Sequence, residues 1–342
     1  MTLLPFLPWP TRPVTGGAAA AVSGVFSAPV RALLDKRLVF VTGKGGVGKS
    51  TVATALGIVA ARRGERTIVA ELANQQRVQQ AFDQSGEQLE EVELDSELFA
   101  ISIDPQQAME EYLRVKAGAV GQALGASRLF QTFAMATPGM RELLSIGKVW
   151  ELAQFERRTE GADAYDFVVV DAPATGHGVG ILRTPRTFAD IARVGPIARQ
   201  GRTIADTIVD SEFTGIVAVA QPEEMAVNET LALLDALADD GLALDAVILN
   251  AVYPPRFANG EVERLGEALA SARSPLARSA LRAALSEHAR AGAQQEQRAR
   301  LAAGLDCPLV ELPYVFCDRL GPEQLAALAA ALEAGLALSA RA

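Results

Sequence analysis

Residues 43–51 read Gly-Lys-Gly-Gly-Val-Gly-Lys-Ser-Thr, a phosphate-binding loop of the form G-x-x-x-x-G-K-S. The apolar run at residues 37–42 predicts a buried strand before the loop, and residues 52–63 predict a helix after it. Glycines suit such a loop because backbone N–H groups can then approach a triphosphate without clashes from Cβ atoms. The order of strand, loop and helix therefore predicts an ATP site. We expect the nucleotide to contact Gly43, Lys44, Gly45, Gly46, Val47, Gly48, Lys49, Ser50 and Thr51.

Three side chains of this loop carry the expected chemistry. Lys49 is placed to reach the β- and γ-phosphates, and the Ser50 hydroxyl is placed to bind Mg²⁺ near the positive end of the following helix. Lys44 is a second lysine, at a position that carries no fixed charge in an ordinary loop of this kind. It either donates to a phosphate, in its own subunit or across a dimer interface, or is a solvated surface lysine.

A second motif begins with the apolar run Phe-Val-Val-Val-Asp at residues 167–171, which predicts a buried strand. Its last residue, Asp171, is expected to hold Mg²⁺ through water beside the phosphates. The alternative is a helix cap or turn residue, which the pairing with the phosphate loop disfavours. His177, in the turn that follows, is either a hydrogen-bonding surface group or a working residue. The catalytic set predicted here includes Lys44, Lys49 and Asp171, with Ser50 and Asp171 as metal ligands.

The composition restricts the class of protein. A chain of 342 residues can bury a full core, and a net charge of −9 without a basic run argues against nucleic acid as the main partner. No apolar stretch reaches the roughly 18 residues that are needed to cross a bilayer. Cys307 and Cys317 form no C-x-x-C pair, so neither a disulfide framework nor a structural zinc site is expected. We expect a cytoplasmic protein.

Apolar runs alternate with helical patterns along the chain, which is typical of a doubly wound, mostly parallel α/β sheet. Residues 1–36 are rich in proline, glycine and alanine and predict a disordered or loosely packed tail before a single domain at residues 37–338. Residues 104–160 contain no strand-like run and predict a helical subdomain, and residues 259–304 are a candidate second one. Seven strands are predicted, at residues 37–42, 67–71, 98–103, 167–171, 215–220, 246–250 and 309–312.

The loop G-K-G-G-V-G-K-S-T and a strand ending in D-A-P-A-T-G-H together resemble the ArsA family, which includes arsenical-pump ATPases and ATPases that target tail-anchored proteins. The resemblance covers most of residues 37–335, including residues 138–142 and 221–230. It implies a P-loop NTPase with a deviant Walker A loop, which binds ATP with Mg²⁺ and works as a dimeric ATPase. The expected partner is a second copy or a homologous subunit, and a protein or membrane-associated species is one candidate client.

The resemblance also implies roles for residues outside the two motifs. Asn250 ends the sixth predicted strand, where the family reads adenine with a side-chain amide; in isolation such a residue is more often a strand cap. Pro313 and Val315 lie in the segment that packs against the base in the family. Lys44 is expected to cross the dimer interface to the partner's nucleotide, so that ATP closes the dimer.

The segment after the second strand departs from the family pattern. The family carries an aspartate there that orients the attacking water, whereas this chain has Ala73, and alanine cannot polarise water. Glu71 lies two residues earlier, on the same side of the strand but about 6 to 7 Å farther back. Glu71 either supplies the missing carboxylate or is a strand-end residue paired to an arginine. A further alternative is a subunit that hydrolyses ATP weakly, or only with a partner subunit.

The client stays unassigned. Two cysteines ten positions apart make a poor soft-metal site, which disfavours an arsenite pump subunit. Long apolar groove helices are not evident, because residues 188–208 contain arginine and are broken at a Gly-Pro pair. Three functions remain: a nucleotide-switched ATPase, a metalloid or anion pump ATPase, and a hydrolysis-impaired subunit that stabilises an active relative. The side chains that either line a client surface or form the core are Phe130, Phe133, Met135, Met140 and Leu144.

Overall fold

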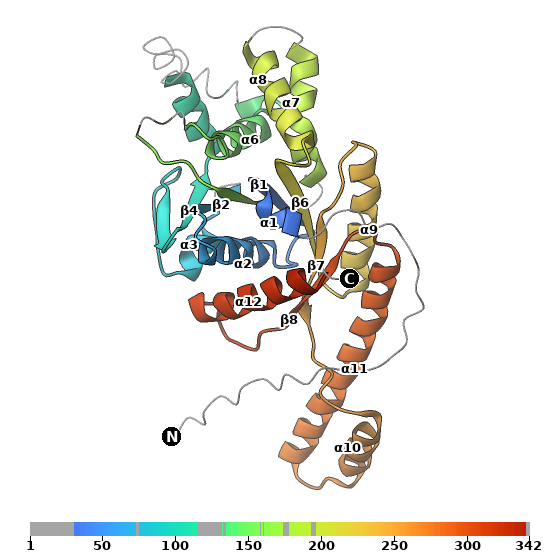
Figure 1. Ribbon diagram of the computed structural model, residues 1–342. Coiled ribbons are helices and arrows are strands. Elements are labelled where there is room, and N and C mark those ends of the chain that lie inside the picture. Colours follow the sequence, from blue (N-terminus) through green and yellow to red (C-terminus); the bar gives the residue numbers. More distant parts are fainter. Residues whose placement is uncertain are drawn as a thin grey trace.

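The computed structural model describes residues 31–72, 75–114, 132, 135–157, 159, 161–173, 178–192 and 196–339. These residues form a layered α/β fold in which helices cover both faces of a central sheet (Figure 1). The predicted fold class is therefore confirmed.

Within the described residues, eight strands form one sheet in the order β3-β4-β2-β5-β1-β6-β7-β8. All neighbours pair in parallel except β3 and β4, which are antiparallel. Each predicted strand is present, and the prediction missed β3. The strands are β1 Leu38–Gly43, β2 Thr67–Leu72, β3 Val92–Asp95, β4 Leu98–Ile103, β5 Phe167–Asp171, β6 Thr214–Ala220, β7 Ala246–Val252 and β8 Leu309–Pro313.

The sequence signal of β3 is weak for a physical reason. Its four residues, Val-Glu-Leu-Asp, include two carboxylates and alternate between half-buried and exposed positions at the edge of the sheet. A tight turn with Glu97 at φ 60° joins it to β4. By contrast, all residues of β1, β2 and β5 are buried, which is why their apolar runs are easy to recognise.

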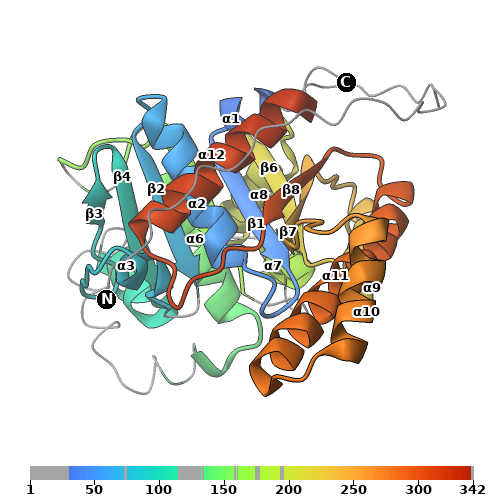
Figure 2. The same ribbon diagram turned by 90° about the horizontal axis from the view of Figure 1, so that it is seen from below.

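One face of the sheet is covered by α2 (Lys49–Arg62) and α12 (Pro322–Ser339), which lie side by side (Figure 2). Every residue of α2 from Val52 to Ala60 is buried, because the sheet covers one side of this helix and α12 another. Such a core helix gives the loop at its N-terminal end a rigid base. The shorter helix α3 (Arg77–Ala81) packs against the start of α2 and the end of β2.

The opposite face is covered by helices α6, α7, α8 and α9, whose apolar side chains join one core cluster with the strands. Residues 105–114 are also helical, and the predicted helical subdomain therefore contributes that segment and α6. Residues 115–131 and 133–134, including Phe130 and Phe133, lie outside the described residues, and the domain division stays a prediction. The four helices are α6 Met140–Leu152, α7 Gly178–Ala192, α8 Pro196–Val209 and α9 Glu224–Ala238.

Two further helices, α10 (Asn259–Ser271) and α11 (Pro275–Ala303), form a hairpin that extends away from the sheet (Figure 1). Most of its residues are exposed, and the buried residues of α11 lie in its second half, toward the sheet. At the other end of the described chain, α1 (Arg31–Asp35) buries Leu33 and Leu34 against the sheet. The last residues of the expected tail thus form a short helix that contacts the core, and residues 1–30 lie outside the described part.

Candidate functional site

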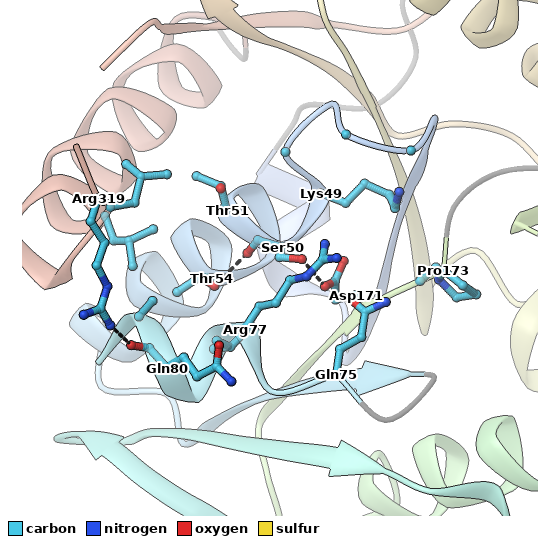
Figure 3. Close-up of a pocket in the computed structure, with 18 residues that line it drawn as sticks. Lys49, Ser50, Thr51, Thr54, Gln75, Arg77, Gln80, Asp171, Pro173 and Arg319 are labelled. Carbon is cyan, nitrogen blue, oxygen red and sulfur yellow. Dashed lines mark hydrogen bonds between the residues drawn. The ribbon is translucent and has the colours of Figure 1, made fainter. Parts of the chain in front are cut away.

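The phosphate-binding loop joins β1 to α2 at the carboxyl end of the central strands. A cavity of about 620 Å³ opens there, between this loop, the end of β5, α3 and the segment before α12 (Figure 3). This is the edge of an open parallel sheet at which ligands bind. The predicted site residues that line the cavity are Gly45, Gly46, Gly48, Lys49, Ser50, Thr51 and Asp171.

Two glycines of the loop are required by close packing. Gly48 has φ +95°, and a Cβ atom there would lie 2.2 Å from Asn250 Nδ2. Gly43 has φ +142°, and a Cβ atom there would lie 2.3 Å from the carbonyl oxygen of Val219. Asn250 Nδ2 also donates a hydrogen bond of 2.9 Å to the carbonyl oxygen of Val47. The loop is thus fixed against β6 and β7.

Lys49 lies at the base of this loop, with 9% of its surface exposed. Its Nζ donates a hydrogen bond of 2.9 Å to the carbonyl oxygen of Lys44, which leaves further N–H groups for an anion. Burial lowers the pKa of Lys49, the charge of Asp171 raises it in part, and the charge of Arg77 lowers it again. A bound anion would favour the charged ammonium here.

Ser50 and Asp171 connect the two sequence motifs. Ser50 Oγ donates a hydrogen bond of 2.5 Å to Asp171 Oδ2, whereas the buried Oδ1 has no hydrogen-bond partner among the described residues. Burial raises the pKa of Asp171, although the hydrogen bond from Ser50 and the charges of Lys49 and Arg77 act in the opposite direction. An unpaired carboxylate oxygen beside a serine hydroxyl fits Mg²⁺, which prefers oxygen ligands and keeps several waters.

Glu71 lies beside Asp171 in the sheet, because the two residues are partners in the β2–β5 register. Its side chain is fully buried and does not line the cavity. Oε1 accepts a hydrogen bond of 2.8 Å from the backbone N–H of Arg77, and Oε2 has no partner among the described residues. Burial raises the pKa of Glu71 to about 7, and the nearby charge of Asp171 acts in the same direction. The structure thus gives Glu71 a position behind the cavity wall.

Sequence reasoning missed two arginines that line the cavity, Arg77 in α3 and Arg319 before α12. Arg319 donates hydrogen bonds to the carbonyl oxygen of Gln80 and to Asp83 Oδ1, the latter at 2.9 Å. It therefore connects the segment before α12 to the end of α3. The sequence offered one signal for Arg77, its position in the segment after β2. It offered none for Arg319, because no nearby sequence feature places this residue close to the phosphate loop.

The side chain of Lys44 extends toward α9. Its Nζ forms an ion pair of 2.9 Å with Glu229 Oε1, and both side chains are partly exposed. Lys44 is not among the residues that line the cavity. The Lys44 ammonium therefore pairs with α9 outside the cavity, whereas the Lys49 ammonium lies at the cavity and contacts the Lys44 backbone.

The residues predicted to hold the base lie on the other side of the loop. Asn250 faces the loop through its bond to Val47, and Pro313 and Val315 do not line the main cavity. A second cavity of about 700 Å³ is lined by Tyr253 and Tyr314, whose rings stack at 4.7 Å between centroids. The predicted roles of these residues in reading adenine stay predictions.

Ala73 and His177 lie outside the described residues. In the part of the chain that the structure describes, no helix is both long enough and apolar enough to span a membrane. No group of three or more acidic, histidine or cysteine side chains among those residues is arranged to hold a metal ion. The magnesium ligands expected here are fewer, a serine and an aspartate, with the remaining positions left to water and phosphate.

Comparison with known proteins supports the same interpretation. Residues 36–200 and 190–267 match the family model described as anion-transporting ATPase. The ATPase BagA of Mycobacterium tuberculosis is 31% identical over 301 residues, which cover 82% of this chain and 87% of that protein. The arsenical pump-driving ATPase of Escherichia coli is 29% identical over 236 residues, 63% of this chain and 39% of that one. The ATPase GET3 of Podospora anserina is 29% identical over 163 residues, 46% of each chain.

Proposed function

The chain belongs to the family of anion-transporting ATPases, and we propose that it binds ATP with Mg²⁺ at the phosphate loop and hydrolyses it within a dimer. The observation that carries this proposal is the convergence of Lys49, Ser50 and Asp171 on one cavity. These groups come from two segments more than a hundred residues apart, and they supply the cation, hydroxyl and carboxylate that phosphoryl transfer requires.

Different groups of the site would bind the phosphates and the metal ion. Backbone N–H groups and the Lys49 ammonium would bind the β- and γ-phosphates, and Ser50 and Asp171 would hold Mg²⁺, which would supply positive charge to offset that of the phosphates. In hydrolysis, a water oxygen bonds to the γ-phosphorus as the bond to the β-phosphate oxygen breaks, and the proton lost by the water passes to a base. The products are ADP and inorganic phosphate.

The proposal has two versions, which differ in whether this chain itself supplies the base that receives the proton. Glu71 is our candidate, because its pKa of about 7 suits proton transfer and its Oε2 is unpaired among the described residues. The buried position of Glu71 behind the cavity wall supports the second version, in which this subunit hydrolyses ATP weakly and assists an active relative. The substitution Ala73→Asp also tests whether this chain hydrolyses ATP weakly because it lacks a carboxylate at that position.

In a dimer, Lys44 would bind the nucleotide of the neighbouring subunit. Its ammonium lies at the protein surface beside α9, where it can exchange Glu229 for a phosphate of a neighbouring subunit. The partner is either a second copy of this chain or a homologous ATPase subunit. Asn250 and the segment containing Pro313 and Val315 would then bind adenine near the second cavity, with the rings of Tyr253 and Tyr314 close by.

For the client, we propose a protein or membrane-associated species rather than arsenite. Cys307 is half-buried, and burial together with nearby carboxylates raises the pKa of its thiol to about 11, so the thiolate needed for a soft metal is scarce. Cys317 is free and exposed. A cytoplasmic location, where ATP is available, stays part of this proposal.

The proposal is tested by phosphate release from purified protein with ATP and Mg²⁺, measured for wild type, Glu71→Gln and Ala73→Asp. Loss of turnover in Glu71→Gln would support Glu71 as the base, and unchanged turnover would remove it from the mechanism. Weak wild-type turnover that rises strongly in Ala73→Asp would favour the hydrolysis-impaired subunit. Size-exclusion chromatography with and without ATP, alone and with co-purified native partners, tests the dimer and shows whether its subunits are identical.

A further inference from the structure

Arg77 is the first residue of α3, and its backbone is firmly anchored. Its N–H donates to Glu71 Oε1 at 2.8 Å, and the two residues that follow, Val78 and Gln79, are buried. Gln79 accepts a hydrogen bond from the N–H of Gly86. The start of α3 is therefore held from several directions, and Glu71 fixes the backbone from which the Arg77 side chain extends.

The side chain of Arg77 is exposed and lines the cavity (Figure 3). In Figure 3 it extends from α3 across the cavity toward Ser50 and Asp171. Among the described residues, no hydrogen bond or ion pair connects its guanidinium to another group. Arg319, which lines the same cavity, instead uses its guanidinium to bind Gln80 and Asp83.

The charges around this guanidinium favour a polyanion. Arg77 and Lys49 are both cationic and close enough to act on each other electrostatically, whereas Asp171 is the nearby carboxylate that lines the cavity. Three cationic side chains, Lys49, Arg77 and Arg319, outnumber this carboxylate among the described residues that line the cavity, so the cavity attracts an anion. The planar guanidinium offers five N–H donors in a fixed arrangement that matches phosphate oxygens. The loop occupies one wall of the cavity, so Arg77 approaches from the opposite wall.

We propose that Arg77 is a catalytic residue that donates hydrogen bonds to the γ-phosphate of bound ATP, opposite the phosphate loop. This inference rests on the proposed ATPase function and adds a group from the same chain. Negative charge on the transferred phosphoryl oxygens is stabilised by the guanidinium as the bond to the β-phosphate breaks. Glu71 is then also a positioning residue, because its carboxylate fixes the backbone from which Arg77 extends. ADP lacks the γ-phosphate and does not gain from this contact.

The test compares Arg77→Gln, Arg77→Lys and Arg319→Gln with wild type. A non-hydrolysable ATP analogue and ADP are titrated with Mg²⁺ by calorimetry, and single-turnover hydrolysis is measured separately. For Arg77→Gln we expect the affinity for the analogue to fall by about tenfold while ADP affinity changes less than about twofold, and hydrolysis to slow by at least about 10²-fold. Arg77→Lys should recover part of both losses, and Arg319→Gln should keep the wild-type ratio of the two affinities.

An unchanged ratio of analogue to ADP affinity in both folded Arg77 variants would overturn the inference, since a structural role would weaken both ligands alike. Circular dichroism and thermal unfolding establish that each variant is folded. If Arg77→Gln does not fold, the ratio of analogue to ADP affinity is compared between Arg77→Lys and wild type. A wild-type protein that binds neither nucleotide would instead defeat the proposed function. The two failures are therefore distinguished by the wild-type titration alone.

Discussion

The hydroxyl of Ser50 donates a hydrogen bond of 2.5 Å to Asp171 Oδ2, so the end of the phosphate loop and the end of β5 are in direct contact. Ser50 is fixed by the first turn of α2, and Asp171 is fixed by the centre of a buried parallel sheet. Neither group must move far to share a cation. Such preorganisation lowers the cost of binding a charged ligand.

Replacement of Asp171 by asparagine should remove the effect of Mg²⁺ on nucleotide affinity. We expect the affinity for Mg²⁺–ATP to fall by about tenfold or more, with little change in the affinity measured with a chelator present. Burial raises the pKa of this carboxyl group, so a neutral amide of the same shape should not lower the free energy of unfolding at pH 7. Calorimetric titrations with and without Mg²⁺ measure the effect. An unchanged magnesium dependence would remove Asp171 from the metal site.

Replacement of Glu71 by glutamine should change how stability depends on pH in the absence of nucleotide. The pKa of Glu71 rises from 4.5 to about 7 on folding, so between these values the folded chain binds a proton that the unfolded chain has lost. The free energy of unfolding therefore falls as pH rises through this window, by about 3 kcal/mol in total. In Glu71→Gln, the free energy of unfolding measured by denaturation from pH 5 to pH 8 should no longer show this fall.

Glu151 provides a control of opposite sign for that experiment. It is buried, which raises its pKa, but hydrogen bonds and charges from Arg157 and Lys148 outweigh burial and lower the pKa. Its contribution to stability is therefore present at neutral pH and lost as the pH falls through the folded pKa, and Glu151→Gln should destabilise the protein near pH 7. If both variants showed the same pH profile as wild type, our description of the two carboxyl groups would be incorrect.

Replacement of Glu229 by glutamine should free Lys44 without unfolding the protein. The ion pair is partly exposed, so its loss should cost about 1 kcal/mol or less. We expect ATP-dependent association to strengthen several-fold in Glu229→Gln and to disappear in Lys44→Ala, because Lys44 is proposed to reach the partner's nucleotide. Sedimentation velocity with and without ATP measures both effects. Asp235→Asn, an exposed change on the same helix, is the control and should behave as wild type.

Replacement of Gly48 by alanine should disrupt the loop more than replacement of Gly46. Both glycines have positive φ values, +95° and +86°, so a side chain strains both positions. A Cβ atom at Gly48 would in addition lie 2.2 Å from Asn250 Nδ2, whereas one at Gly46 meets nothing within 4 Å. We expect thermal unfolding to show the larger loss for Gly48→Ala, by about 1 to 3 kcal/mol relative to Gly46→Ala. Equal losses would indicate that backbone strain alone sets the requirement.

The parts of this fold that could be predicted are those with a strong local signal. The glycine-rich loop and the strand before it are recognisable because every residue of β1 is buried and the loop composition is distinctive. The strand ending in Asp171 is equally apolar, and the parallel arrangement brings its end to the same sheet edge. Recognition of these two segments was enough to predict the convergence of Ser50, Lys49 and Asp171.

The parts that could not be predicted depend on contacts between distant segments. The ion pair of Lys44 with Glu229 joins the loop to α9, and nothing near either residue indicates it. Arg157 is 1% exposed and forms ion pairs with Glu91 and Glu151, a buried network that a sequence pattern cannot distinguish from surface charge. The direction of a polar side chain is set by the packing around it, so its role becomes visible after the fold is known.

Calorimetric titration of ATP with Mg²⁺ into wild type and Lys49→Ala measures whether Lys49 and its loop bind a triphosphate. We expect saturable binding of one nucleotide per subunit to wild type and no measurable binding to the folded Lys49→Ala variant. Absence of binding to folded wild type, or wild-type affinity in Lys49→Ala, would show that this loop is not the triphosphate site.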